Sequence, residues 1–247
     1  MKRCSIPGSR RRVDHRGQCP RGIFSGFTVL ELLTVVAILA VLAAILIPTL
    51  GGGRIAALRA QTRVQFSQWA AAFESHRQEY GSYPSFPSRR ASALINEGVT
   101  ADPRASHWFH DALAGVRRDG TSVAPDSSTE DSPNSRGIRF HFFHSGELVS
   151  PADVAAGRNS ADDLNLIRDA FHHTSIAVVV DANRDGMITA ADVPEGLPSV
   201  AAPDGGPELS PPGLGEGTSA AAIRAGVIFY TAGPGATTAD DLILSWR

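Results

Sequence analysis

The sequence from Leu32 to Pro48 contains no charged residue, and a single carboxylate, Glu31, stands directly in front of it. A helix from Phe27 to Ile47 at about 1.5 Å per residue is roughly 31 Å long, which matches a hydrocarbon core of about 30 Å. We therefore predict a membrane-spanning helix over residues 27–50. A carboxylate in such a segment is costly to bury, so Glu31 is a candidate functional residue.

The residues before this run form a basic leader, 1–26, with seven Lys and Arg residues and one acid, Asp14. Positive charges stay on the cytoplasmic side, so the leader predicts a cytoplasmic N-terminus. The apolar run is also longer than the roughly 7–15 residues of a secretory signal. Both cysteines, Cys4 and Cys19, lie in the leader, and the remainder has none with which to form a disulfide.

The residues Gly26-Phe27-Thr28-Val29-Leu30-Glu31 resemble the class III signal of type IV pilins and type II secretion pseudopilins. The resemblance implies that a prepilin peptidase cuts after Gly26 and methylates Phe27, and that Glu31 serves assembly. It implies a single-pass protein of the inner membrane with a periplasmic head, extracted into a filament on assembly. The implied partners are other copies or other pseudopilins and a secretion or pilus assembly platform.

The alternative is a membrane-anchored calcium-binding or ligand-binding domain that never polymerises. Cleavage at Gly26 and lateral association of helices would distinguish the two. Without the leader the chain has a net charge of about −8, so no nucleic-acid partner is expected. The motifs G-x-S-x-G, Walker A and H-E-x-x-H do not occur, and we predict no enzyme.

Residues 51–83 continue the helix as an amphipathic segment. Apolar residues recur there at three- and four-residue spacing, namely Ile55, Leu58, Val64, Trp69, Ala72 and Phe73. Pro48 and the glycines 51–53 are expected to interrupt the helix, and Gly81 and Pro84 to end it. That ending, Tyr80-Gly-Ser-Tyr-Pro84, is similar to the one that closes the long helix of major pseudopilins.

Residues 84–247 form the predicted globular head. β-Branched and aromatic runs predict strands at Ser175–Val180, Gly137–His144, Ala225–Tyr230 and Leu242–Trp246. Short helices are expected at Ala91–Asn96 and Ser106–Val116. The fold class is therefore α+β, with the long N-terminal helix packed on a small antiparallel sheet and long loops.

The strongest chemical motif of the head lies in residues 181–192. It matches the calcium-loop pattern D-x-[DN]-x-[DN]-G with an acid at position twelve, and its candidate ligands are Asp181, Asn183, Asp185, Met187, Thr189 and Asp192. Met187 would contribute its backbone carbonyl, and Ile188 would point into the core. The loop resembles those of dockerin-type repeats, and calcium is the predicted cofactor. An Asp/Asn turn without metal is the simpler alternative.

Asp240 and Asp241 are candidates for a second metal site. Their turn, Gly233–Leu242, resembles the C-terminal turn of major pseudopilins, where paired Asp residues help to hold calcium. Two acids that cap a loop would have the same sequence. The histidines that are close in sequence, such as His141 and His144, do not predict zinc, because strand geometry points them to opposite faces and no cysteine is near.

Overall fold

The computed structural model describes residues 28–246 apart from 85, 87–89, 124–133 and 212–221. Two compact units are present, Met1–Leu50 and Gly51–Arg247. The predicted cleavage site, Gly26 and Phe27, lies outside the described residues. We refer to the second unit as the head.

Helix α1 extends from Val29 to Tyr80. Its backbone is helical through Pro48 and Gly51–Gly53, so the predicted interruption is wrong, although the boundary between the two units falls at that place. Among the described residues, no helix combines the length and the apolar character needed to cross a membrane. The predicted membrane-spanning first half of the helix is therefore wrong.

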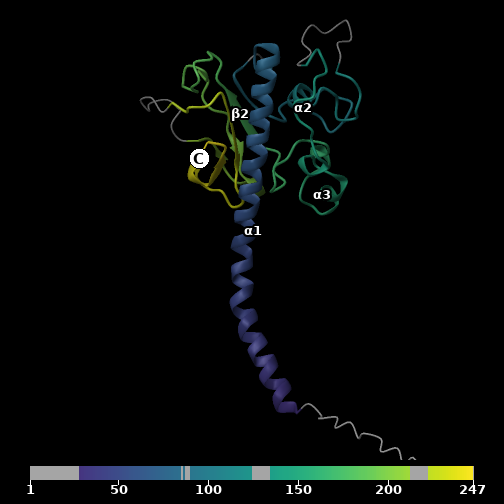
Figure 1. The fold of residues 1–247 in the computed structure, drawn as a ribbon, viewed down its shortest axis with the longest axis vertical. Coiled ribbons are helices and arrows are strands. Elements are labelled where there is room, and N and C mark those ends of the chain that lie inside the picture. Colours follow the sequence, from purple (N-terminus) through teal and green to yellow (C-terminus); the bar gives the residue numbers. More distant parts are fainter. Residues whose placement is uncertain (1–27, 85, 87–89, 124–133, 212–221, 247) are drawn as a thin grey trace, which may run out of the picture. The chain divides into compact units, whose positions relative to one another are not determined.

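The head is built on a four-stranded antiparallel sheet with the order β1-β2-β5-β6 (Figure 1). The strands are β1 (Ser92–Leu94), β2 (Ile176–Val180), β5 (Val227–Ala232) and β6 (Leu242–Leu244). A second, two-stranded sheet pairs β3 (Val200–Ala201) with β4 (Glu208–Leu209). The remaining α-helices are α2 (Trp108–Ala114) and α3 (Pro151–Ala155). The α+β class is thus confirmed.

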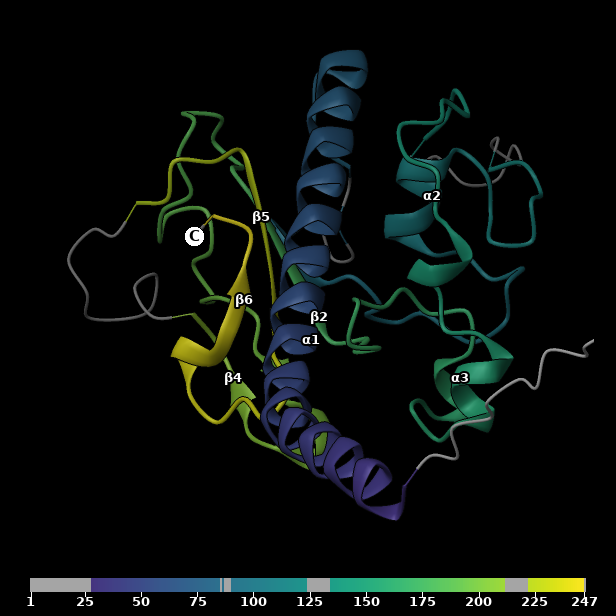
Figure 2. The ribbon, with the colours of Figure 1, turned by 60° about the horizontal axis from the view of Figure 1, so that its bottom comes forward.

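Both faces of the main sheet are buried, and alternate residues of the strands enter two different cores. Val178 and Phe229 pack with the head portion of α1 and with Phe109 of α2. Val179 and Ile228 pack on the opposite face with β3 and β4. Figure 2 shows the head portion of α1 between the sheet and the segment that carries α2 and α3.

The buried stripe of α1 is Thr62, Gln65, Phe66, Trp69, Ala72, Phe73 and His76. The prediction was right for Trp69, Ala72 and Phe73. It was wrong for Ile55 and Val64, which are exposed. Trp69 lies at the centre, with ring centroids 5.2 Å from Phe109 and 5.7 Å from Phe229. The aromatic residues of this stripe therefore determine which face of the head portion of α1 packs on the sheet and on α2.

Several strand and helix predictions are confirmed and two are wrong. The strands expected near 175–180, 225–230 and 242–246 and the helix near 106–116 are present. Residues 91–96, expected to be helical, contain β1 instead, which pairs with β2. Gly137–His144 forms no strand, because the N–H groups of Phe140 and His141 both donate to the carbonyl of Leu113.

Candidate metal loop and assembly motif

Glu31 lies in the first turn of α1 and closes a capping box with Thr28. The Oε2 atom of Glu31 accepts hydrogen bonds from the backbone N and the Oγ1 of Thr28, both at 2.9 Å. In return, the N–H of Glu31 donates to Thr28 Oγ1 at 3.2 Å. This reciprocal pair satisfies donors that are otherwise free at a helix start. The backbone N–H of Thr28, followed by its hydroxyl, lowers the pKa of Glu31.

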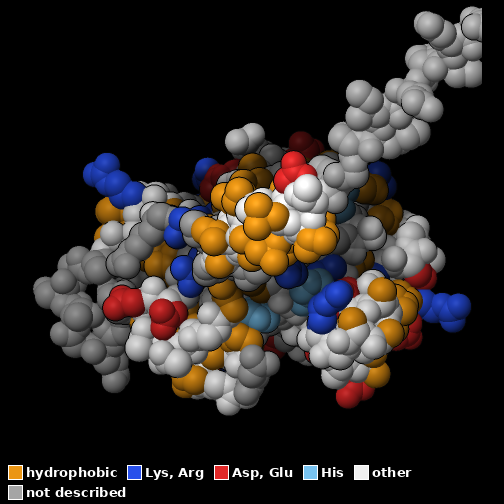
Figure 3. All heavy atoms as spheres, turned by 90° about the horizontal axis from the view of Figure 1, so that it is seen from below, with side chains coloured by type: hydrophobic (Ala, Val, Ile, Leu, Met, Phe, Trp, Pro, Cys, Tyr) orange, Lys and Arg blue, Asp and Glu red, His pale blue; other side chains and the backbone are white. Residues whose placement is uncertain are grey.

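Large apolar side chains on the first turns of α1 are exposed. They are Val29, Leu30, Leu32, Leu33, Val35, Val36, Ile38, Leu39, Val41 and Leu42, and we call this set the apolar segment. Hydrophobic side chains (orange) lie close together in the space-filling view of Figure 3. Contiguous exposed apolar surface of this kind marks an interaction site. Glu31 is the only acid between Thr28 and Leu42.

The candidate calcium loop begins where β2 ends, as predicted. The N–H of Asp181 donates to the carbonyl of Gly226 at 2.9 Å, which fixes the loop to the start of β5. The side chains of Tyr83 and Glu74 approach Gly226 closely, because a Cβ there would lie 2.2 Å from the hydroxyl of Tyr83 and 2.3 Å from Oε1 of Glu74. The loop is therefore positioned against the end of α1 as well as against the sheet.

The carboxylates of Asp181 and Asp192 are both buried and accept backbone hydrogen bonds from the same turn. Asp181 accepts from the N–H groups of Arg184 at 2.6 Å and Gly186 at 2.7 Å. Asp192 Oδ1 accepts from Ala182 at 3.1 Å and Asn183 at 3.3 Å. Asp181 and Asp192, eleven positions apart, are thus joined through the backbone of residues 182–186.

Asp192 also holds the second half of the loop through its other oxygen. Oδ2 accepts from the N–H of Thr189 at 2.9 Å and from Thr189 Oγ1 at 3.0 Å. Burial alone would raise the pKa of Asp192, but the donors from Thr189, Asn183 and Ala182 outweigh it and lower the pKa. The carboxylate is therefore kept charged, as a cation ligand has to be.

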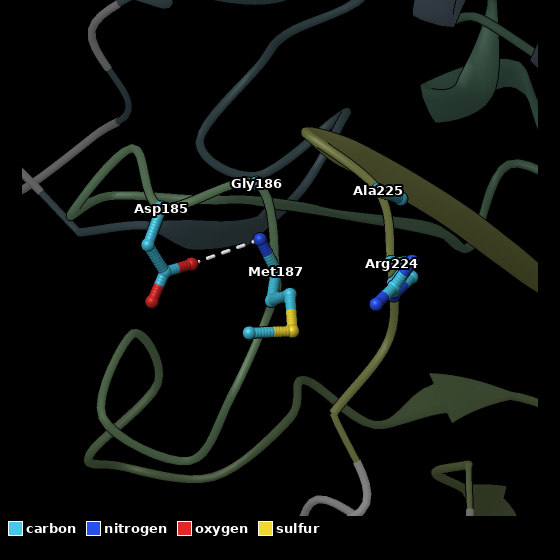
Figure 4. Close-up of a pocket in the computed structure, with 5 residues that line it drawn as sticks. All are labelled: Asp185, Gly186, Met187, Arg224 and Ala225. Carbon is cyan, nitrogen blue, oxygen red and sulfur yellow. Dashed lines mark hydrogen bonds between the residues drawn. The ribbon is translucent and has the colours of Figure 1, made fainter.

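Asp185 and Asn183 occupy the exposed rim of the loop. Asp185 Oδ1 accepts from the N–H of Met187 at 2.9 Å (Figure 4). Asn183 Nδ2 donates to Asp185 Oδ2 at 3.1 Å. Gly186 has a φ of 84°, which glycine adopts without strain. The turn geometry that the motif assigns to its glycine is therefore present.

Ile188 is fully buried, as predicted. It forms an isolated antiparallel bridge with Ile223, with N–O distances of 2.8 and 3.0 Å in the two directions. This bridge anchors the middle of the loop to the segment that precedes β5. The rim residues Asp185 and Met187 border a cavity of about 360 Å³ that Arg224 also lines.

The loop has the predicted residues in one place, but its carboxylates are engaged by N–H groups. Within the described part of the chain, no group of three or more His, Cys, Asp or Glu side chains is arranged to hold a metal. Occupation by a cation would require Asp181 and Asp192 to exchange some N–H donors for the ion. The arrangement as it stands is a set of Asx turns with a negative rim.

Asp240 and Asp241 lie at the other end of the sheet, because β2 and β5 are antiparallel and the turn follows β5. Asp241 Oδ2 accepts from the N–H groups of Thr237 and Thr238 and from Thr238 Oγ1, at 2.9–3.0 Å. These bonds lower the pKa of Asp241. Asp241 therefore caps its turn, and neither acid can join Asp181 around one ion.

A group of polar residues that the sequence analysis missed surrounds Asp153, whose side chain is buried. Asp153 accepts from Ser150 Oγ at 2.6 Å and Arg158 at 2.9 Å, and it lies 3.1 Å from His172 Nδ1. The hydroxyl of Ser150 is the main cause that lowers its pKa. The pattern Ser150-x-x-Asp153 is a readable capping box, but its ties to the arginines and His172 are not local.

Comparison with protein-family models, with curated proteins and with solved structures gave no match. The resemblance to pilin-like proteins therefore rests on the residues of this chain alone.

Proposed function

We propose that the chain is a pilin-like subunit of a type II secretion pseudopilus or a related filament, assembled through the first turns of α1. The exposed apolar segment is the observation that carries this proposal. Ten large apolar side chains in water are unfavourable, since each gains about 1.5–3 kcal/mol when it is buried. The apolar segments of other copies could bury these side chains, because they are apolar as well.

The leader and the motif from Gly26 to Glu31 support the same function. A prepilin peptidase that cuts before Phe27 would produce a free amine four residues from Glu31. The charged carboxylate of Glu31 then matches the cationic amine of a neighbouring copy. Because Glu31 already accepts hydrogen bonds from Thr28, the capping box would hold this carboxylate in a fixed orientation for that partner.

Calcium binding by residues 181–192 remains part of the proposal. It is supported by six matching template positions, by the kept charge of Asp192 and by the turn at Gly186. The same Asx turns form without metal, so this part is tested separately below. The placement of the head outside the cytoplasm also stays a prediction.

The experiment is disulfide trapping in cells that contain a prepilin peptidase. With Ile38→Cys in a chain whose Cys4 and Cys19 are replaced, oxidation is expected to produce a ladder of cross-linked copies. Glu31→Val should abolish the ladder, whereas Glu31→Asp, which keeps the charge, should retain part of it. Ser75→Cys, on an exposed position of the same helix in the head, is the matched control for random collision.

A ladder of equal strength in Glu31→Val would remove Glu31 from assembly. The absence of any ladder with Ile38→Cys, in chains shown by N-terminal analysis to begin at Phe27, would favour the alternative domain that does not polymerise.

A further inference from the structure

A cavity of about 690 Å³ opens in the head, and none of its lining residues belongs to the metal loop. It is formed where the first head turns of α1 meet residues 157–159, residues 170–175 and the segment after β3. All its lining residues belong to the Gly51–Arg247 unit. The volume is in the range of pockets that bind small molecules.

The charges of this cavity all have one sign. Two arginines and two histidines line it, Arg54, Arg158, His172 and His173, and no lining residue is acidic. This is unexpected in a chain with 25 acidic and 23 basic residues. Arginine (blue) and histidine (pale blue) side chains lie together in the space-filling view of Figure 3.

Asp153 orients two of these cations from behind the cavity wall. It contacts Arg158 at 2.9 Å, His172 Nδ1 at 3.1 Å and Arg168 at 3.4 Å, and Arg168 also donates to His172 Nδ1. One carboxylate offsets the charge of only one of the two guanidinium groups that it contacts, Arg158 and Arg168. A guanidinium has five N–H donors, of which Asp153 takes one from Arg158, so donors remain for a ligand.

His173 is held by the opposite wall in one tautomer. Its Nδ1 lies 2.9 Å from the carbonyl oxygen of Ala232, which only accepts, so Nδ1 carries the proton. Nε2 then donates to an anion only when the ring is doubly protonated. The buried Asp169 lies behind it at 3.7 Å, and burial raises the pKa of Asp169, which weakens that negative charge.

Two features of the wall are strained or unsatisfied. His172 has a φ of 71°, a conformation that costs free energy for a residue other than glycine. Asn159 donates from Nδ2 to the carbonyl of His172 at 2.8 Å, while its Oδ1 is buried without a hydrogen-bond partner among the described residues. Such features cluster at binding sites.

We propose that this cavity binds a small anion, with carboxylate or phosphate oxygens held by Arg54, Arg158, His172 and His173. Charge-assisted hydrogen bonds from arginine are the strongest that such oxygens accept. Protonation of the histidines adds donors and positive charge. The affinity is therefore expected to rise as the pH falls from 7.5 to 5.5.

The neighbours of His172 work against its protonation while the cavity has no anion. Burial, followed by Arg168, lowers the pKa of His172, and Arg158 and His173 add to this, whereas Asp153 opposes it. A bound anion opposes these effects and favours the protonated ring. Anion binding should consequently be accompanied by proton uptake.

The test is calorimetric titration of the full chain with inorganic phosphate and, in a second arm, with citrate, at constant ionic strength and at two pH values. Arg54→Gln should weaken binding about tenfold, a loss of one charge-assisted contact. Arg63→Gln removes the same charge from an exposed position of the same helix and should leave binding unchanged. His172→Gln should reduce the proton uptake and the pH dependence.

Binding of phosphate but not citrate would show that the cavity selects phosphate oxygens, and binding of citrate but not phosphate would show that it selects carboxylates. Equal affinities for Arg54→Gln and Arg63→Gln would overturn the proposal, as would the absence of binding at millimolar phosphate and citrate. An unchanged pH dependence in both His172→Gln and His173→Gln would remove the histidines from the site. None of these outcomes depends on filament assembly.

Discussion

Leu33, Ile38 and Leu42, in the first half of α1, are 51–64% exposed, whereas Phe66, Trp69 and Phe73, in the second half, are fully buried. Both sets are large and apolar and lie on one continuous helix. The second set has found its partners within the chain, in β2, β5 and α2. The first set is exposed in the part of the chain that the structure describes, and its burial between copies is the proposal that the following predictions test.

An apolar helix can be stabilised by burial within its own chain or by burial between copies of the chain. Mutations in the second half should change the free energy of unfolding of the head. Mutations in the first half should change association and leave the head intact. Each of the following predictions tests whether the two halves of α1 act separately, or tests one feature of the head alone.

Trp69→Ala should have the largest effect on the head. It removes a fully buried ring that contacts Phe109 and Phe229 and whose Nε1 donates to Glu147 at 3.1 Å. Such a deletion costs about 3–5 kcal/mol of unfolding free energy. Urea denaturation followed by circular dichroism measures it. Val64→Ala, on the exposed side of the same helix, is the control and should cost less than about 0.5 kcal/mol. Equal costs would contradict the assignment of the buried stripe.

The second effect is that of calcium on the head. At a hundredfold excess over Kd, an ion that binds only the folded state adds about 2.7 kcal/mol. For a unit of this size that is a rise of roughly 5–10 °C in Tm. Asp181→Asn keeps an oxygen for the N–H groups of Arg184 or Gly186 but removes the charge, so it should fold and lose the calcium response. Differential scanning calorimetry with calcium and then with chelator measures both.

Asp162→Asn, an exposed acid outside the loop, is the matched control and should respond as the unmodified chain does. A Tm that calcium leaves unchanged would show that residues 181–192 are a turn only. A response that persists in Asp181→Asn would move the site to Asp240 and Asp241.

Local sequence patterns were sufficient to predict the elements with a regular spacing of apolar residues. The three- and four-residue spacing that includes Trp69 and Phe73 identified the head half of α1, and the run 175–180 identified β2. Phe66 was missed although it lies three residues before Trp69 and seven before Phe73. Val64, which was predicted to be buried, lies five residues before Trp69. Which of the two is buried depends on Phe229, to which Phe66 stacks at 5.7 Å, and this residue is more than 160 positions away.

Non-local contacts decided the regions that were predicted wrongly. Phe140 and Phe142 alternate as in a strand, yet the N–H groups of Phe140 and His141 both donate to the carbonyl of Leu113 in α2. Asn134 in addition binds the backbone of Ile138. Its Oδ1 accepts from the N–H of Ile138 at 3.0 Å, and its Nδ2 donates to the carbonyl of Ile138 at 2.6 Å. Likewise, the metal loop was recognisable from its spacing, whereas the cationic cavity was not. Its residues come from five separate stretches of the chain.

A smaller effect is expected from acid. The pKa of Asp153 is lowered in the folded state, first by Ser150 and further by Arg158 and Arg168. Its unfolded pKa is about 3.9, so its contribution to stability is complete above that pH and is lost as the pH falls toward the lower folded value. Asp153→Asn should therefore cost about 1–3 kcal/mol at pH 7 and progressively less below pH 4. Urea midpoints measured from pH 7 to pH 3 give this difference, with Asp162→Asn again as the control. A cost that does not change with pH would mean that the charge of Asp153 is not what stabilises the head.

Leu33→Ala should have the smallest effect on unfolding and completes the comparison with Trp69→Ala. Leu33 is 64% exposed, and alanine has at least the helix propensity of leucine, so the urea midpoint of the head should not move. If the apolar segment is buried between copies, the same substitution removes about 1.5–3 kcal/mol per contact from assembly. Sedimentation of the processed chain would then show fewer and shorter assemblies at an unchanged urea midpoint. A lower midpoint would mean that the first half of α1 stabilises the head, and unchanged assembly would mean that Leu33 is not at the interface. Either result would end the separation between the two halves of the helix.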